Sequence, residues 1–277
     1  MRCKNIDRFI LAISVFIGIV GTTQAGEDIV DKACIAYSQG KLKHAYDLIR
    51  RAKRSPKTRL LSALIKIYYK EQRDLTAAFA ELNSLYEEES IDAAVWRQAA
   101  LAYARAAQLM QRRKNLFPEA ENIPFIDIYE NIIKKYPDSQ EAVYATAYMT
   151  ADYFSSQDIE KCKKGFQISE QFICSFKGNK RLLVPLHLQM DFEYIARERN
   201  YIAAEKHLSL AYKYGIVNPK IKEIALFRLG RINDYKLHNM KAAQKYYLEF
   251  LQKYPYSMYK NVVKRYLSKI NSKAKKR

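Results

Sequence analysis

The chain has 277 residues, of which 49% are hydrophobic and 28% are charged, and its formal net charge is +19. It contains only 8 Gly and 7 Pro, too few for the many turns of an all-β fold. The mean hydropathy of −0.37 leaves enough apolar material for a core. Apolar residues recur at helical spacing along most of the sequence, which predicts an all-α fold of one or two domains.

Residues 1–25 have the pattern of a secretory signal peptide. A basic segment precedes the apolar run from Phe9 to Gly21, and Thr23 and Ala25 place small residues at −3 and −1. We expect cleavage after Ala25 and a periplasmic location. The alternative is an uncleaved segment that anchors the chain in the inner membrane, but the apolar run spans 13 residues, whereas a membrane-spanning helix needs about 20.

Without this segment the chain carries a net charge of +17. One interpretation is an acidic partner, such as anionic lipid headgroups, a polyanion or an acidic protein surface. The other is a compositional bias, and it is favoured because Lys is spread along the chain. The exception is the segment 271–277, which we expect to be a disordered basic tail.

Three cysteines follow the signal segment, an odd number that leaves at least one unpaired. Cys162 and Cys174 lie twelve residues apart on one predicted helix, about 18 Å along its axis, which is too far for a disulfide. Buried, reduced cysteines are therefore expected. A bridge from Cys34 to Cys162 or to Cys174 stays open.

The first half of the mature chain predicts two helix pairs and a longer helix. The pairs cover 26–53 and 58–89, and an Ala-rich helix over 92–113 places Trp96 in the core. The loop that follows is the least regular part of the sequence. It marks a possible sub-boundary at 114–124 within one helical domain that covers 26–270.

The second half continues the same alternation of helices and polar turns. We predict helices in these segments: 125–136, 141–154, 159–176, 184–215 (a helix pair), 225–255 (a helix pair) and 257–270. Gly178 is expected to end the third of these in the left-handed conformation. The last helix is expected to cap the apolar surface of the final pair.

The segment from Ala225 to Pro255 has the clearest pattern. Gly230 lies on the apolar stripe of its first helix, where a second helix could pack closely. Ala242 and Tyr246 lie on the stripe of the second helix, and Pro255 ends it.

These residues resemble a tetratricopeptide repeat (TPR), with Leu229-Gly230, Ala242, Tyr246 and Pro255 at the matching positions. The copy departs from the pattern at Asn233, where Tyr is usual, and its proline falls one residue late. It looks like the TPRs of the bacterial cell envelope, as in outer-membrane assembly lipoproteins and the periplasmic partner of the Tol-Pal system. The resemblance implies a right-handed α-solenoid whose groove binds a protein or peptide.

No motif in the sequence predicts catalysis. There is no Gly-rich phosphate loop, no HExxH, no CxxC pair and no GxSxG. The four histidines, His44, His187, His207 and His238, are isolated on separate predicted elements. We therefore predict no enzyme, no metal site and no cofactor.

The resemblance assigns groove positions to five residues: Tyr144, Tyr148, Phe227, Arg231 and Asp234. Tyr offers contact area at low entropic cost, and Arg binds carboxylates bidentately. The predicted function is a non-catalytic periplasmic scaffold that binds another envelope protein or peptide. For the tyrosines, packing between repeats is an equally good interpretation.

Two other functions fit the sequence less well. One is a basic protein that binds a membrane surface or polyanion, whose affinity would fall steeply with salt. The other is an enzyme accessory or a helical glycan-binding domain. No nucleic acid partner is expected, and the oligomeric state stays open.

Overall fold

The computed structural model describes residues 29–69, 74–88, 90–112 and 120–274. Every regular element in these ranges is helical, which confirms the predicted all-α fold class. No helix in the described ranges is both long and apolar enough to cross a membrane. The predicted signal segment and Cys3 lie outside these ranges.

The contacts divide the chain into two compact units, which we call unit 1 (Met1–Met149) and unit 2 (Thr150–Arg277). The division falls within helix α8 (Gln140–Ser155). Much of the predicted sub-boundary at 114–124 lies outside the described residues, so it stays a prediction.

Unit 1 consists of helices that pack on their neighbours in the chain: α2 (Ile29–Ser38), α3 (Leu42–Ile49), α4 (Pro56–Tyr68), α5 (Leu75–Glu87), α6 (Ala93–Gln111) and α7 (Phe125–Lys135). The first part of α8 also belongs to unit 1 and meets α7 where the Tyr148 ring contacts Tyr129. Helix α4 begins at Pro56, two residues before the predicted start of its pair at 58. The reason is a capping box, in which Ser55 accepts a hydrogen bond from the Thr58 amide and Thr58 accepts one from the Ser55 amide, with Pro56 in the first turn.

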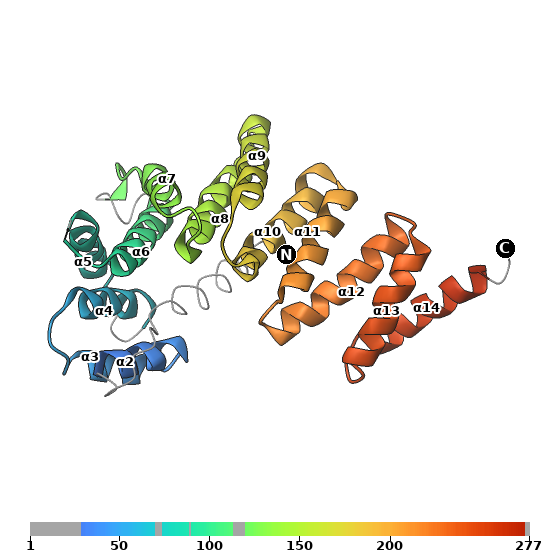
Figure 1. Cartoon of the computed structure of the whole chain (residues 1–277), viewed down its shortest axis with the longest axis horizontal. Coiled ribbons are helices and arrows are strands. Elements are labelled where there is room, and N and C mark those ends of the chain that lie inside the picture. Colours follow the sequence, from blue (N-terminus) through green and yellow to red (C-terminus); the bar gives the residue numbers. More distant parts are fainter. Residues whose placement is uncertain (1–28, 70–73, 89, 113–119, 275–277) are drawn as a thin grey trace. The chain divides into compact units, whose positions relative to one another are not determined.

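Unit 2 contains the rest of α8 and, in chain order, α9 (Ile159–Ser175), a 3₁₀ turn η3 (Lys180–Leu183), α10 (Val184–Glu193), a π turn η4 (Tyr194–Glu198), α11 (Tyr201–Tyr214), α12 (Pro219–Tyr235), α13 (Met240–Lys253) and α14 (Lys260–Ala274). From α10 onwards each α-helix packs on the next (Figure 1). This neighbour-to-neighbour packing is the pattern of an α-solenoid.

Helix α14 covers the apolar side of α13, as predicted for a terminal helix. Val263 and Ile270 are buried in the cluster that also holds Phe250. The helix continues to Ala274, so residues 271–274 are helical and do not belong to the expected disordered tail. A hydrogen bond of 3.0 Å from Gln244 to Asn271 helps to hold this last turn.

The two glycines near helix ends in unit 2 behave differently. Gly215 ends α11 with a φ of +102°, a conformation that favours glycine. Gly178 is not among the described residues with positive φ, so the predicted left-handed end of α9 is wrong. Helix α9 stops earlier, at Ser175, because Phe176 is extended and buries its side chain.

Candidate functional site

Helices α12 and α13 approach each other closely at Gly230, which lies against the Tyr247 ring. A Cβ atom on Gly230 would lie 2.4 Å from Cε1 of Tyr247. Tyr247 and Ala243 are fully buried beneath this contact. The predicted close approach of the two helices at Gly230 is therefore confirmed.

The residues of α13 that pack against α12 lie one position later in the sequence than the match to the repeat predicted. Ala243 and Tyr247 are buried, whereas Ala242 and Tyr246 are only partly buried. The turn holds one residue more than the repeat pattern, and it contains His238 with a φ of +52°. This shift also explains why Pro255 falls one residue late.

Arg231 is the predicted groove residue that lies open to solvent. Its guanidinium carbon lies 5.6 Å from the centre of the Tyr235 ring. The Tyr235 ring in turn packs edge-on against Tyr266 of α14, at 5.3 Å between ring centres. No ion pair of Arg231 occurs among the described residues, so its guanidinium donors face solvent in this part of the structure.

Phe227 and Asp234 are held by their neighbours. The Phe227 ring stacks on Tyr259 with 4.6 Å between ring centres and an interplanar angle of 15°. Asp234 accepts a hydrogen bond of 3.3 Å from the Tyr247 hydroxyl. Burial, followed by the nearby Asp234 carboxylate, raises the pKa of Tyr247, so this hydroxyl stays a donor.

Tyr144 and Tyr148 on α8 are buried, with 8% and 4% of their surface exposed. Their rings stack on each other at 6.1 Å, and the Arg105 guanidinium lies 4.4 Å from the Tyr148 ring centre. These two rings therefore pack inside the protein, as the alternative interpretation of the tyrosines predicted. Their assignment to a binding groove stays a prediction.

The structure joins two histidines that the sequence analysis treated as isolated. His187 on α10 and His207 on α11 are fully buried, and their Nδ1 atoms lie 2.9 Å apart. The expectation of isolated histidines is wrong for this pair. They meet because α10 and α11 pack against each other across the π turn, which a pattern search in the sequence does not reveal.

The partners of this pair determine its protonation. Nε2 of His207 lies 2.8 Å from Oε1 of Glu170, and the Tyr194 hydroxyl donates to the same oxygen at 2.9 Å. If His207 carries its proton on Nε2, its Nδ1 accepts from the Nδ1–H of His187. The arrangement thus suits two neutral imidazoles in a row of hydrogen bonds that ends on the Glu170 carboxylate.

Burial controls the pKa values of these groups. It lowers the pKa of His187 to about 4, reinforced by His207, and it also lowers the pKa of His207 against the opposing pull of Glu170. Burial alone would raise the pKa of Glu170, but the hydrogen bonds from His207 and Tyr194 outweigh it and leave this pKa lowered.

A second buried charge lies nearby on α10. Asp191 is fully buried and forms a two-point ion pair with Arg228 on α12, with contacts of 2.8 and 3.1 Å. Burial raises the pKa of Asp191 to about 6, although Arg228 acts in the opposite direction. This pair links α10 to α12 across the intervening helix.

Within the described residues, no group of three or more His, Cys, Asp or Glu side chains could hold a metal ion. The three cysteines that follow the signal segment are free. Cys34 is buried as expected, whereas Cys162 is half-buried and Cys174 is exposed. The expectation of burial is thus wrong for Cys174.

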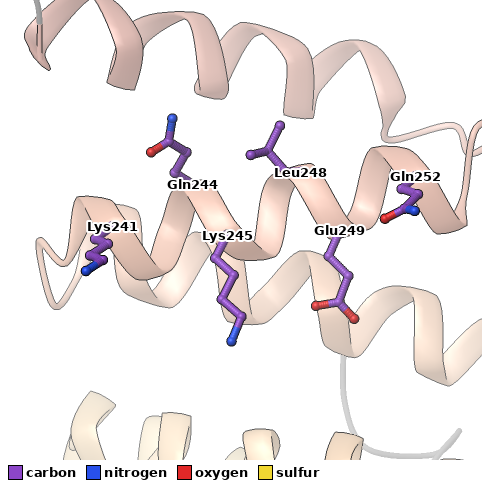
Figure 2. Close-up of a pocket in the computed structure, with 6 residues that line it drawn as sticks. All are labelled: Lys241, Gln244, Lys245, Leu248, Glu249 and Gln252. Atoms are coloured by element: carbon purple, nitrogen blue, oxygen red, sulfur yellow. The ribbon is translucent and has the colours of Figure 1, made fainter.

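A shallow hollow lies along α13, on the side away from Tyr247. Figure 2 shows that Gln244 and Leu248 point to one side of the helix, while Lys245 and Glu249 point to the other. Glu249 is engaged by Lys253 at 2.7 Å and by the Tyr212 hydroxyl at 2.9 Å. The hollow therefore offers mixed polar contacts without an enclosed cavity.

Comparisons with known proteins leave the function open. No protein-family model matches the sequence, and no curated protein matches it. Among solved structures, a thermophilic TPR protein from Thermus thermophilus is similar, with 18% identity and a TM-score of 0.40 over 77% of this chain and 98% of that chain.

Proposed function

We propose that the chain is a non-catalytic periplasmic scaffold that binds another cell-envelope protein or peptide. The main support for this proposal is the exposed position of Arg231. It is exposed, its guanidinium stacks on Tyr235, and it lies on the first helix of the pair that packs like a TPR. A partner carboxylate would replace water on an arginine that is already oriented.

The test compares two exposed arginines that stack on tyrosine. Arg50 at the end of α3 lies 5.8 Å from the Tyr46 ring centre, a contact like that of Arg231, but it lies on the second helix of its pair. The mature chain and its Arg231→Ala and Arg50→Ala variants are used to capture partners from solubilised envelopes at low and high salt.

We expect the wild type and Arg50→Ala to retain specific partner proteins at high salt. We expect Arg231→Ala to lose these same proteins. Substitution of Tyr144 or Tyr148 is avoided, because these rings are buried and their loss would disturb unit 1. Equal capture by all three chains, or no protein retained at high salt, would contradict the proposal.

The periplasmic location is tested separately. N-terminal sequencing of the chain from a periplasmic fraction should begin at Gly26. A chain that keeps residues 1–25 and sediments with the inner membrane would support the anchored alternative.

A further inference from the structure

The turn between α13 and α14 presents two apolar side chains to solvent. Tyr256 is 98% exposed and Met258 is 75% exposed. Their neighbours point inward: the Tyr259 ring stacks on Phe227, and the Ser257 hydroxyl donates to the Glu223 carboxylate. The exposure of Tyr256 and Met258 is therefore imposed by a turn that is fixed on both sides.

The sequence around this turn is basic and lacks acidic residues. The last 28 residues, from Phe250 onwards, contain nine Lys and Arg and no Asp or Glu. Residues 150–277 contain 26 Lys and Arg against 11 Asp and Glu, whereas residues 1–149 contain 22 against 18. The positive charge is thus concentrated in unit 2, which corrects the expectation of an even spread.

The packing of α14 decides where these charges lie. Val263 and Ile270 are buried against α13. Lys264, Arg265 and Lys269 are consequently exposed, and none of the three has an ion pair within the described part of the chain. We call Tyr256, Met258, Lys264, Arg265 and Lys269 the terminal face.

We propose that the terminal face binds the surface of an anionic lipid bilayer. Lys and Arg near such a surface each contribute about 1 kcal/mol of attraction. Tyr and Met are suited to the boundary between headgroups and acyl chains, since both bury apolar area. Charge and apolar insertion together provide the two signals that stable attachment requires.

The apolar pair distinguishes this partner from other polyanions. A nucleic acid or an acidic protein would be held mainly by the cations of α14, whereas a bilayer uses these cations and also takes up the two apolar side chains at its headgroup boundary. The terminal face contains none of the predicted groove residues, so Arg231→Ala and the terminal-face variants test protein binding and bilayer attachment separately, although Tyr235 beside Arg231 packs on Tyr266 of α14.

The test measures co-sedimentation of the mature chain with vesicles at low ionic strength. We expect binding to vesicles that contain phosphatidylglycerol and much weaker binding to pure phosphatidylcholine. The variant Lys264→Gln/Arg265→Gln/Lys269→Gln should bind about 100-fold more weakly, since three cations are lost. The variant Tyr256→Ser/Met258→Ser should lose about 10-fold, and this loss should persist at high salt.

Two control variants in unit 2 keep the same changes in charge and apolarity at other exposed positions. These are Lys161→Gln/Lys164→Gln/Lys213→Gln and Ile202→Ser/Val217→Ser. Both should bind nearly as well as the wild type. Far-UV circular dichroism confirms that each variant is folded.

Three outcomes would overturn the proposal. Equal losses in the terminal-face and control variants would show that net charge alone drives binding. Equal binding to both kinds of vesicle would exclude recognition of anionic headgroups. Failure to bind vesicles, combined with tight binding to poly-glutamate or to DNA, would assign the basic helix to another class of partner.

Discussion

Each compact unit contains a buried polar network, and the two networks use different chemistry. In unit 1, Gln108 is the centre. Its side-chain oxygen accepts from the Arg105 guanidinium at 2.6 Å and from the Tyr129 hydroxyl at 3.2 Å, and its amide donates to the Tyr148 carbonyl at 3.1 Å. The network therefore consists of guanidinium, amide and hydroxyl groups.

In unit 2 the centre is a pair of imidazoles, His187 and His207, that ends on Glu170 and Tyr194. Every member of this network can gain or lose a proton. A network built on arginine and amide groups fixes the packing independently of pH, whereas one built on histidine ties the stability of its unit to pH. The comparison therefore predicts that only unit 2 responds to mild acid.

We expect the largest effect from a substitution that breaks the polar network of unit 1. Gln108→Leu leaves the buried Arg105 and Tyr129 donors without this acceptor, so we expect a loss of about 3 kcal/mol in the free energy of unfolding. Trp96, the only tryptophan, lies in unit 1 and reports its unfolding by fluorescence in denaturant. The double variant Arg105→Leu/Gln108→Leu should lose less than the single one, because it does not keep the buried Arg105 charge next to the missing Gln108 acceptor. A greater loss in the double variant would show that Gln108 does not support Arg105.

Acidification tests the network of unit 2. The pKa of folded His187 is lowered to about 4, against about 6.5 when unfolded. The unfolded chain therefore binds more protons in this window, and the resulting stability is present above about pH 6.5 and lost as the pH falls towards 4. Between about pH 7 and pH 5 we expect His187 to account for a loss of about 2 kcal/mol.

Asp191 acts in the opposite direction. Its folded pKa of about 6 is raised above its ordinary value of 3.8, so its contribution favours the folded state as the pH falls through 6 and offsets about 1 kcal/mol of the loss at about pH 5. Asp191→Asn should thus steepen the acid dependence, and His187→Gln should flatten it. Circular dichroism follows both units, and Trp96 fluorescence is the internal control from unit 1. An unchanged slope in His187→Gln would contradict this role.

The smallest effect comes from a matched pair of hydroxyl deletions. Tyr129→Phe removes a bond to the neutral Gln108, and Tyr194→Phe removes one to the charged Glu170. We expect losses of about 1 and about 2 kcal/mol respectively in the free energy of unfolding, because hydrogen bonds to charged groups are stronger. Equal losses would mean that Glu170 does not carry its charge in the folded unit.

Sequence patterns predicted the helices and most of their ends well. In the pair 225–255, the turn between α12 and α13 and the close approach at Gly230 both follow from local residue types. Its first helix, however, begins at Pro219, six residues before the predicted start, with Asn218 as its N-cap. The register of α13 was missed by one residue. Spacing alone cannot show whether an extra residue is absorbed in a turn, as His238 does with its positive φ.

The site was only partly predictable. Arg231 is exposed in the structure, and its assignment to a groove stays a prediction. The burial of Tyr148 and the inward stacking of Phe227 depend on other helices. The meeting of His187 with His207 left no signal in the sequence, because the contact joins residues 20 positions apart on two packed helices. The spacing of residues in the sequence shows which of them share a face of one helix, but it does not show which residues of two helices meet.

The sequence by itself determined the fold class, the helix pairs and the basic composition, because these depend on residue type and on the 3.6-residue period of a single helix. Tertiary structure decided which side of each helix is buried. It left Lys264, Arg265 and Lys269 of α14 exposed, fixed Tyr256 and Met258 outward, and enclosed the two histidines. These features arise from contacts between helices, and such contacts form only when the chain folds.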